Sequence, residues 1–196
     1  MPALHIDTLP LGPLQTNCYL VSRPGSDHVV VIDPGDDVHA LANALSGRHV
    51  DGVLITHAHF DHILGLPAVA DAPIYVHESD APAMTDASRN HAYAAIPSVP
   101  ATCTVQEGDL ISLAGIDFTV LHTPGHTLGG VCYLAQDALF TGDTLFAQGY
   151  GRTDLYGGNW SQLLASLRRL LALKGNYRIY PGHGPAADLN QLKGNA

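Results

Sequence analysis

Basic residues are scarce in this sequence. It has 9 Lys and Arg against 18 Asp and Glu, which gives a formal net charge of -9, and no block of Lys or Arg occurs along the chain. Proteins that bind nucleic acids neutralise phosphates with clustered cations. The composition therefore disfavours nucleic acid and anionic membrane surfaces as partners, and a small molecule is the expected partner.

Cysteine is rare and long apolar runs are missing. The three cysteines, Cys18, Cys103 and Cys132, are widely spaced and form no C-x-x-C pair, so we expect reduced thiols in the core rather than disulfides or a thiolate metal site. No apolar stretch reaches the roughly 18 residues of a membrane-spanning helix, and no basic segment precedes an apolar one at the start. We therefore expect a cytoplasmic protein without signal peptide or transmembrane helix.

Apolar residues make up 46% of the 196 residues and charged residues 14%, so a single domain spanning 1–196 is the simplest prediction. Strand-like patterns precede helical ones in both halves, which favours a layered α/β fold. The Pro- and Ala-rich stretch 78–100 has weak periodicity and is predicted to be a mobile flap. Helices are predicted over 37–47, 62–70 and 159–173, and strands over 4–9, 17–22, 28–33, 50–56, 73–77, 102–106, 115–122, 129–135, 138–142 and 177–180.

Histidines and aspartates gather just after four of the predicted strands. The segments are "THAHFDH" (56–62), "HTPGHT" (122–127), "TGDT" (141–144) and "PGHG" (181–184). Loops at the carboxyl ends of strands are where α/β folds place their chemistry, because a rigid scaffold holds loops of free geometry. We therefore expect the four loops to share one edge of the fold.

These loops contain five imidazoles and two carboxylates, more than one metal ion needs. A catalytic zinc usually takes three protein ligands and a water, so seven candidates suit two divalent ions that share a bridging carboxylate. Imidazole and carboxylate suit zinc, iron, manganese or cobalt, and we expect zinc first, with iron or manganese as alternatives. The candidate ligands are His57, His59, Asp61, His62, His126, Asp143 and His183.

In this order and spacing, the four motifs resemble those of the metallo-β-lactamase superfamily over nearly the whole chain. "LGPLQTNCYLV", "VIDPG" and "GYGRTDLYGG" are most similar to small, single-domain glyoxalase II-like (hydroxyacylglutathione hydrolase-like) enzymes. The resemblance implies a four-layer αβ/βα sandwich in which two mixed β-sheets face each other. It also disfavours β-lactam hydrolysis, because lactamases of this superfamily generally lack the bridging aspartate.

The resemblance implies a role for each candidate ligand. Two neighbouring cations lower the pKa of a shared water, so a bridging hydroxide is expected to attack the substrate carbonyl near neutral pH. Asp61 and Asp143 are the implied catalytic residues, with Asp61 a metal ligand first and a proton shuttle second. The first ion is assigned to His57, His59 and His126, the second to Asp61, His62 and His183, and the bridge to Asp143.

The implied substrate is a thioester, in particular hydroxyacylglutathione, since a thiolate leaves with little acid assistance. Full-length glyoxalase II enzymes add a helical domain with cationic contacts to glutathione. This chain ends soon after "PGHG", and its two lysines, Lys174 and Lys193, lie near no motif. The resemblance is therefore to the shorter relatives, and the acyl group and the oligomeric state stay open.

Three other functions fit the same residues. A persulfide dioxygenase of this superfamily also has a G-R-T-D loop and binds one iron, for which His57, His126 and Asp143 are candidate ligands. A lactonase or phosphodiesterase uses similar ligands, and a domain that binds metal without catalysis is the third alternative. Metal content, thioester hydrolysis and oxygen uptake together separate the hydrolase, the dioxygenase and the domain without catalysis, and a hydrolase panel should include lactones and phosphodiesters.

Several polar residues near the motifs have two interpretations each. Arg152 is a candidate for binding a substrate carboxylate, or it pairs with Asp154; Tyr150, in the same loop, is a further candidate substrate-binding residue. Asp33 either orients a metal ligand or serves a strand-end turn. The remaining histidines are expected at structural, surface or loop positions, with His77 and His122 nearest the motifs: His5, His28, His39, His49, His77, His91 and His122.

Overall fold

Two six-stranded mixed β-sheets form the centre of the computed structural model, which describes residues 3–91, 96 and 98–193. The first sheet has the order β1-β2-β3-β4-β5-β6. Its first three strands are antiparallel, and β3 to β6 run parallel. They are β1 (His5–Leu11), β2 (Thr16–Ser22), β3 (His28–Ile32), β4 (His49–Leu54), β5 (Ile74–His77) and β6 (Cys103–Val105).

The second sheet has the order β12-β11-β10-β9-β8-β7. β10 and β11 run parallel, and the other neighbours are antiparallel. The short strands β7 and β12 were not predicted. The strands are β7 (Leu110–Leu113), β8 (Ile116–His122), β9 (Val131–Ala135), β10 (Ala138–Gly142), β11 (Arg178–Pro181) and β12 (Ala187–Asp188).

Seven short or medium helices join the strands. Asp37 and Asn159 cap α1 and α4 by accepting hydrogen bonds from Ala40 N (2.9 Å) and Gln162 N (3.0 Å), which satisfies backbone donors that a helix start leaves free. The α-helices are α1 (Val38–Ala44), α2 (Phe60–Ile63), α3 (Ala87–Asn90), α4 (Trp160–Leu171) and α5 (Leu189–Lys193), and the 3-10 helices are η1 (Leu66–Ala68) and η2 (Ala81–Met84).

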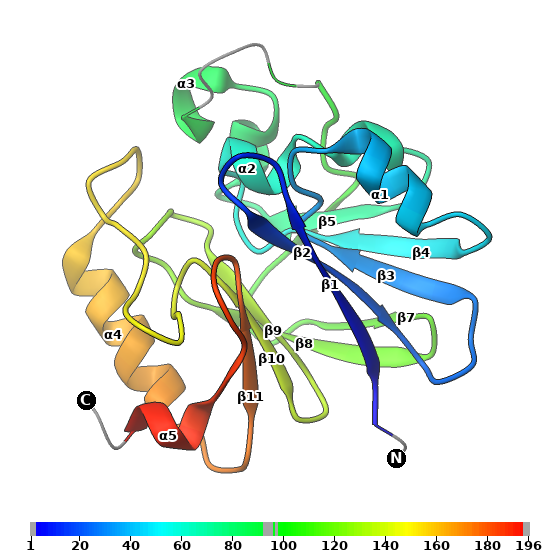
Figure 1. Cartoon of the computed structure of the whole chain (residues 1–196). Helices are drawn as coiled ribbons and strands as arrows, with labels where there is room; N and C mark the ends of the chain where they lie inside the picture. The colour runs from blue at the N-terminus through cyan, green and yellow to red at the C-terminus, as the bar shows by residue number, and fades with distance from the viewer. Residues whose placement is uncertain (1–2, 92–95, 97, 194–196) are drawn as a thin grey trace.

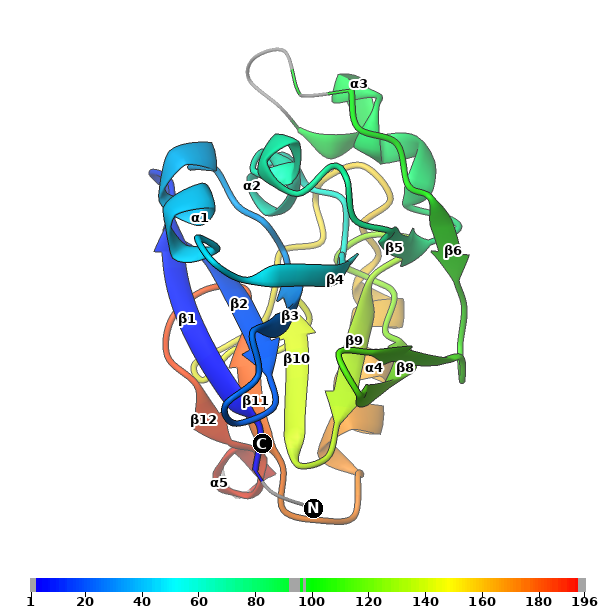
Figure 2. The same cartoon turned by 90° about the vertical axis from the view of Figure 1, so that its right-hand side faces the viewer.

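Three apolar clusters separate four layers. Side chains alternate along a strand, so Cys18 and Leu20 of β2 face one cluster while Tyr19 and Val21 face another. The first cluster lies between the first sheet and α1, the second lies between the sheets, and the third lies between the second sheet and α4. Figures 1 and 2 show helices on the outer face of each sheet. The predicted four-layer sandwich is confirmed.

Two predictions about local structure were wrong. The expected helix over 62–70 divides into α2 and η1, because Pro67 lacks an N–H and Gly65 packs so close to the Gly35 backbone that a side chain would collide with it. Cys18 and Cys132 are buried free thiols as expected, but Cys103 is partly exposed. Its strand, β6, lies at the edge of the first sheet, where less of the fold covers it.

The stretch predicted to be a mobile flap begins with packed structure. η2 and α3 fall within it, and Met84 and Asn90 are buried. The Asn90 side chain donates a hydrogen bond to the Ala83 carbonyl (2.8 Å). This part lies against the domain rather than forming an open flap, and residues 92–95 and 97 lie outside the described residues. No helix in the described parts of the chain is long and apolar enough to cross a membrane.

Candidate metal centre

Three imidazoles meet where β4 and β8 end. His57 and His59 follow β4, and His126 follows β8. Their ligand nitrogens lie within 4.8 Å of one another, and all three side chains are buried. We call these residues the three-histidine group. The structure thus brings together the residues assigned to the first metal by resemblance, from loops of both sheets.

A second group lies beside the first. Asp61 and His62 belong to α2, and His183 follows β11. Asp61 Oδ2 is 3.5 Å from His62 Nε2 and 3.3 Å from His183 Nε2. These three residues can also hold a metal ion, and we call them the carboxylate group.

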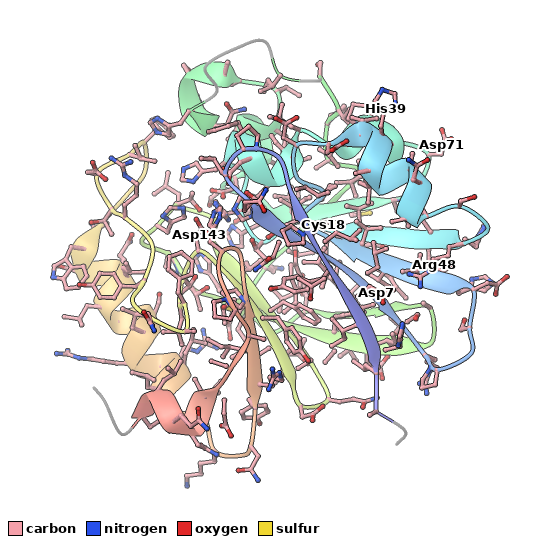
Figure 3. All side chains as sticks on the ribbon, in the orientation of Figure 1. Asp7, Cys18, His39, Arg48, Asp71 and Asp143 are labelled. Atoms are coloured by element: carbon pink, nitrogen blue, oxygen red, sulfur yellow. The ribbon has the colours of Figure 1, made fainter. Side chains whose placement is uncertain are left out.

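Asp143 lies between the two groups. It follows β10 directly, and its Oδ2 is 3.6 Å from His126 Nε2 and 3.5 Å from His183 Nε2. Its Oδ1 is 3.4 Å from His62 Nε2. Figure 3 labels Asp143 amid nitrogen-bearing side chains. One carboxylate therefore contacts imidazoles of both groups, at the place that a bridging ligand requires.

The atoms that face this centre fit bound cations. Imidazole nitrogens and a carboxylate oxygen lie buried without a hydrogen-bond partner among the described residues, which is a costly arrangement unless another group satisfies them. Divalent transition metals accept imidazole and carboxylate ligands and would satisfy such atoms. The atoms are Nε2 of His57, His59, His62 and His126, and Oδ1 of Asp143.

The opposite nitrogen of three rings is fixed by an acceptor. His62 Nδ1 donates to Asp33 Oδ2 (2.9 Å), His126 Nδ1 donates to the Arg152 carbonyl (2.7 Å), and His183 Nδ1 contacts the Leu14 carbonyl at 3.2 Å. A proton held on Nδ1 leaves a lone pair on Nε2, which is the arrangement that metal-bound histidines need. The rings are therefore oriented toward the centre before any ion binds.

Asp33 orients a ligand and also serves the strand-end backbone. Besides His62, its carboxylate accepts hydrogen bonds from the Thr56 N–H (2.7 Å) and the Thr56 hydroxyl (2.6 Å). The Thr56 hydroxyl also lies 3.1 Å from His57 Nδ1. These contacts support the interpretation of Asp33 as a residue that orients a candidate ligand and link the two groups from behind; they go to Thr56 and His62 rather than to the turn that follows β3.

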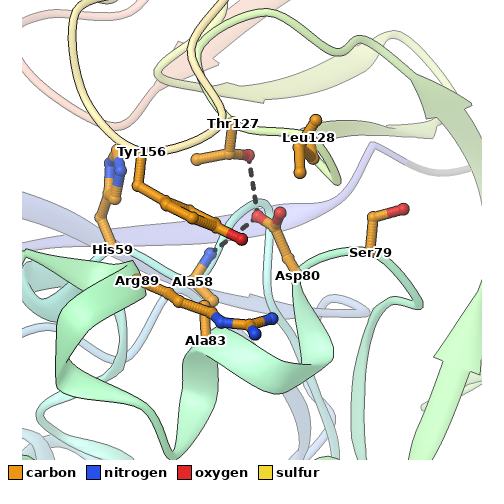
Figure 4. A pocket seen from close by; sticks show the side chains of 9 residues that line it. All are labelled: Ala58, His59, Ser79, Asp80, Ala83, Arg89, Thr127, Leu128 and Tyr156. Atoms are coloured by element: carbon orange, nitrogen blue, oxygen red, sulfur yellow. Dashed lines mark hydrogen bonds between the residues drawn. The ribbon is translucent and has the colours of Figure 1, made fainter.

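Asp80 is a supporting residue that the sequence did not single out. Its buried carboxylate accepts hydrogen bonds from the Ala58 N–H (3.2 Å), the Thr127 hydroxyl (2.8 Å) and the Gly129 N–H (2.7 Å). Figure 4 shows the first two of these bonds. Ala58 lies between His57 and His59, and Thr127 follows His126, so Asp80 holds together the two loops of the three-histidine group. The sequence signal that could have identified Asp80 is its position shortly after a predicted strand, which the structure shows as β5.

A glycine permits the close approach of the "PGHG" and "TGDT" loops. A Cβ at Gly182 would collide with the Asp143 carboxylate and with the His62 ring. The Gly182 N–H also donates to the Gly142 carbonyl (2.8 Å). The motif thus needs glycine at 182 for packing against the centre, while His183 supplies the ligand atom.

The two groups differ in how burial and neighbouring charges shift the pKa values of their side chains. Burial, reinforced by neighbouring imidazoles, lowers the pKa of His57 well below its usual range and that of His59 to about 3. Burial opposes the charged form of His183, but its contacts with Asp143 and Asp61 outweigh this and raise its pKa to about 9. The imidazoles of His57 and His59 are thus neutral, and the second group pairs carboxylates with imidazoles.

The carboxylates themselves stay ionised. Burial raises the pKa of Asp61 and Asp143, yet the charge of His62 and the contact with His183 outweigh it and leave both pKa values below their usual range. These same carboxylates hold the pKa of His62 above its usual range despite its burial. A cation at this centre takes over the charge balance that those imidazole protons otherwise supply.

A cavity of about 650 Å³ opens onto the centre. Its wall includes His59, Asp61, His126, Asp143 and His183, together with apolar residues of the 11–14 loop. This volume lies within the range of small-molecule sites, roughly 300–1,000 Å³. A substrate in the cavity therefore reaches atoms of both ligand groups.

His91 was expected at a surface or loop position; it lies in a turn after α3 and also lines the cavity. Its ring lies 5.5 Å from that of His59, and its Nε2 accepts a hydrogen bond from the Tyr156 N–H (2.8 Å). No ligand-like spacing marks it in the sequence. His77 and His122 are not cavity-lining residues; their rings stack at 4.1 Å.

Arg152 makes one of its two predicted contacts, the ion pair with Asp154. Its guanidinium forms two hydrogen bonds to Asp154, both of 2.7 Å, and the residue lines the cavity. Tyr150 is exposed, and its ring packs against Trp160 at 5.2 Å rather than lining the cavity. Substrate binding by either residue stays a prediction.

The model of the family "Metallo-beta-lactamase superfamily" matches residues 11–183. The chain belongs to the metallo-beta-lactamase superfamily. It is 34% identical over 193 residues to the probable metallo-hydrolase YqgX of Bacillus subtilis, with 92% of this chain and 90% of that protein covered. It is also 34% identical over 161 residues to a hydroxyacylglutathione hydrolase of Yersinia pestis, with 80% of this chain but 57% of that protein covered.

Solved structures of this superfamily are similar along nearly the whole chain. The BLEG-1 B3 metallo-beta-lactamase has 36% identity and a TM-score of 0.90, with 95% of both chains covered. TTHA1623, solved in a di-iron-bound form, has 40% identity and a TM-score of 0.80, covering 93% of this chain and 94% of that one. ETHE1 from Myxococcus xanthus has 30% identity and a TM-score of 0.78, covering 96% and 81%.

Proposed function

We propose that the protein is a dinuclear metal-dependent hydrolase of thioesters, with hydroxyacylglutathione as its favoured substrate. The observation that carries the proposal is the carboxylate of Asp143 between two ligand groups, each of which has at least one buried imidazole nitrogen without a hydrogen-bond partner among the described residues. The similar metallo-hydrolase and hydroxyacylglutathione hydrolase support it.

Seven side chains would hold the two ions. A pair of divalent cations supplies an activated water near neutral pH and polarises a substrate carbonyl. The first ion would be held by His57, His59 and His126, the second by Asp61, His62 and His183, and both by Asp143.

The chain itself contributes positioned imidazoles and a proton acceptor. Asp33 and the Arg152 carbonyl keep imidazole lone pairs directed at the reacting centre, so no ring has to turn during the reaction. Asp61 faces the cavity, and its carboxylate is held by the Thr16 hydroxyl (2.7 Å). An ionised carboxylate in this position can take a proton from an attacking water and pass it on. The thiolate then leaves with little acid assistance.

The metal identity belongs to the proposal as well. We propose zinc as the resident metal, with iron or manganese as alternatives, since this donor set suits all three. The di-iron form of TTHA1623 makes iron a specific competitor. Elemental analysis of protein purified without added metal distinguishes them: two zinc ions per chain support the proposal, and two iron ions move the assignment to iron.

A second candidate function is persulfide dioxygenase activity, because ETHE1 is similar along most of the chain. His57, His126 and Asp143 lie together, with the rings of His57 and His126 at 4.7 Å and Asp143 Oδ2 at 3.6 Å from His126 Nε2. This function uses one iron. A site with a single iron gives no role to the buried Nε2 atom of His59 or to the carboxylate group. The dinuclear hydrolase is therefore favoured.

The test is a substrate panel on the metal-loaded protein. We expect thiol release from S-lactoylglutathione with a higher kcat/KM than hydrolysis of a lactone or a phosphodiester. A β-lactam belongs in the panel, because the similar BLEG-1 structure is that of a lactamase while the resemblance of the motifs disfavours this activity. Oxygen consumption with glutathione persulfide and one iron per chain would overturn the hydrolase proposal.

Substitution of Arg152 tests whether this residue binds a carboxylate of the substrate. We expect Arg152→Ala to raise KM for the glutathione thioester about 10-fold or more, as loss of one charged hydrogen bond does, with kcat and metal content nearly unchanged. The bond from His126 goes to the Arg152 backbone carbonyl, so the substitution retains it. Asp154→Asn is the matched control; equal KM values in Arg152→Ala and wild type would remove Arg152 from the binding site.

A further inference from the structure

A separate cluster of ligand-type side chains lies at the opposite end of the first sheet. His28 begins β3 and His49 begins β4, and the two residues are direct partners in the parallel register of these strands. Their rings lie 4.8 Å apart at an angle of 65°. Two imidazoles on adjacent strands thus project side by side, away from any motif of the metal centre.

A β-bulge adds a carboxylate to this pair. The register of β3 and β4 shifts between Val29 and Val30, where the partner in β4 changes from Val50 to Gly52. Asp51 is therefore the extra residue of the bulge, a feature that redirects side chains at sheet edges. Asp51 Oδ1 lies 2.6 Å from His28 Nδ1 and 4.0 Å from His49 Nε2.

The Asp51 carboxylate is anchored from behind. Its Oδ2 accepts a hydrogen bond from the Ala114 N–H (3.0 Å), which leaves Oδ1 facing the imidazoles. The nearby guanidinium of Arg48 is paired with Asp7 (2.8 Å). An anchored ligand loses less conformational entropy when it binds an ion, as outer contacts do in known metal sites.

The three ligand atoms lie within 4.8 Å of one another. Both histidines are exposed, so solvent and ions reach them freely. Figure 3 places Arg48, the residue before His49, on the opposite side of the molecule from Asp143. Ions bound here and at the metal centre would therefore occupy distinct sites.

We propose that His28, His49 and Asp51 form a peripheral binding site for zinc that joins the first residues of β3 and β4. Two imidazoles and one carboxylate match zinc and other late transition metals better than Mg²⁺ or Ca²⁺, which prefer oxygen ligands. Water completes the coordination, as the exposure of the cluster allows. This site does not depend on the proposed hydrolase activity.

A simple ion pair between His28 and Asp51 is the competing explanation. It accounts for the 2.6 Å contact but gives His49 no role, since 4.0 Å is too long for a hydrogen bond. The two explanations differ in what removal of His49 does. Loss of zinc binding in His49→Ala follows from the metal site, whereas an ion pair of His28 with Asp51 predicts no change.

The experiment is equilibrium dialysis of the full chain against zinc chloride, followed by elemental analysis. The metal centre is loaded first, and the zinc bound beyond that amount is counted. We expect one additional zinc ion per chain in the wild type and none in His49→Ala or Asp51→Asn. His39→Ala, which removes an exposed histidine from α1, is the matched control and should bind as the wild type does.

A second readout separates ligation from misfolding. Proton resonances of the His28 and His49 rings, assigned by comparing His28→Ala and His49→Ala spectra, should shift together with added zinc in the wild type. His49 is largely exposed, so its truncation should leave the other resonances in place. The proposed site would be overturned by equal zinc content in wild type and His49→Ala, or by ring resonances that do not shift when zinc is added.

Discussion

The two ligand groups of the metal centre are held in different ways. The three-histidine group consists of buried imidazoles, and Asp80 joins its two loops through backbone and hydroxyl donors. The carboxylate group includes His183, whose side chain is 29% exposed, and Asp33 bonds directly to its His62 ring. The positions of the three histidines thus depend on hydrogen bonds that join their two loops. The positions of the side chains in the carboxylate group depend on charge and on a direct hydrogen bond to the His62 ring. Asp143 lies between the two groups and contacts imidazoles of both.

Asp143→Ala should have the largest effect on metal binding, because it alters the contacts of both groups. Removing the shared carboxylate leaves imidazoles of both groups without their common partner, so we expect loss of both metals and of hydrolysis together. The loss should exceed the roughly 10–100-fold caused by changes to outer contacts of metal sites. Metal content and thioester turnover measured on one preparation test it. Full turnover in this variant would disprove the proposed centre.

Asp33→Asn should weaken the carboxylate group next. Asparagine tolerates the left-handed backbone found at this position, with φ of 51°, so the backbone should persist. The amide keeps one acceptor oxygen for the three donors that Asp33 now serves, the His62 ring and the two groups of Thr56. We expect metal affinity at the carboxylate group to fall roughly 10–100-fold.

Competition with a chelator measures this change for each ion separately. The effect on the three-histidine group should be smaller, since Asp33 reaches His57 only through the Thr56 hydroxyl. Equal weakening of both ions would mean that the two groups bind metal as one unit, which would break the distinction between them.

Asp80→Asn should affect the three-histidine group selectively. A single amide oxygen would meet the donors of Ala58, Thr127 and Gly129, so at least one buried donor loses its partner. Such a loss costs about 1–3 kcal/mol. We expect lower stability of the metal-free protein in denaturant unfolding and weaker binding of the first ion.

Asp86→Asn provides the control for Asp80→Asn. Asp86 also accepts hydrogen bonds after the same strand, but at the exposed start of α3. It should leave metal binding unchanged. If Asp80→Asn retained both ions with wild-type affinity, the loops would be held by their own turns rather than by this carboxylate.

The candidate ligands could be picked out from the sequence because each follows a strand in a short motif. Strand ends at one edge of a sheet bring such loops together whatever lies between them, so His57 and His183 converge from distant parts of the chain. The order of strand-like and helical patterns in both halves likewise favoured a layered α/β fold, and the resemblance of the motifs implied its four layers. These features depend on local pattern, which the sequence displays.

Other parts of the site depend on contacts that no local pattern records. Asp80 and His91 act through partners 22 to 65 residues away, and neither has ligand-like neighbours. The break of the predicted helix at Gly65 follows from packing against Gly35, a contact made only in the folded chain. Tertiary proximity, rather than residue type, decides these features.

Substitution of a carboxylate outside the metal centre should leave metal binding by both ligand groups unchanged, which would sharpen the comparison between them. Glu107 pairs with Arg169 on the surface, and its Oε2 accepts a hydrogen bond from the His122 N–H (2.7 Å), four residues before His126. The hydrogen bond from Arg169 lowers the pKa of Glu107. Its stabilising effect is therefore present above the carboxyl's unfolded pKa and is lost as the pH falls through the lower folded value.

Glu107→Gln should reduce stability at neutral pH by about 1 kcal/mol or less, since exposed pairs contribute little. The difference from the wild type should shrink as the solution is acidified, because the wild-type carboxyl then also loses its charge. Denaturant unfolding across this pH range gives both values, and metal analysis should find both ions retained. If Glu107→Gln lost an ion, the placement of His126 would depend on the end of β8 as well as on Asp80, and the three-histidine group would have a second outer support.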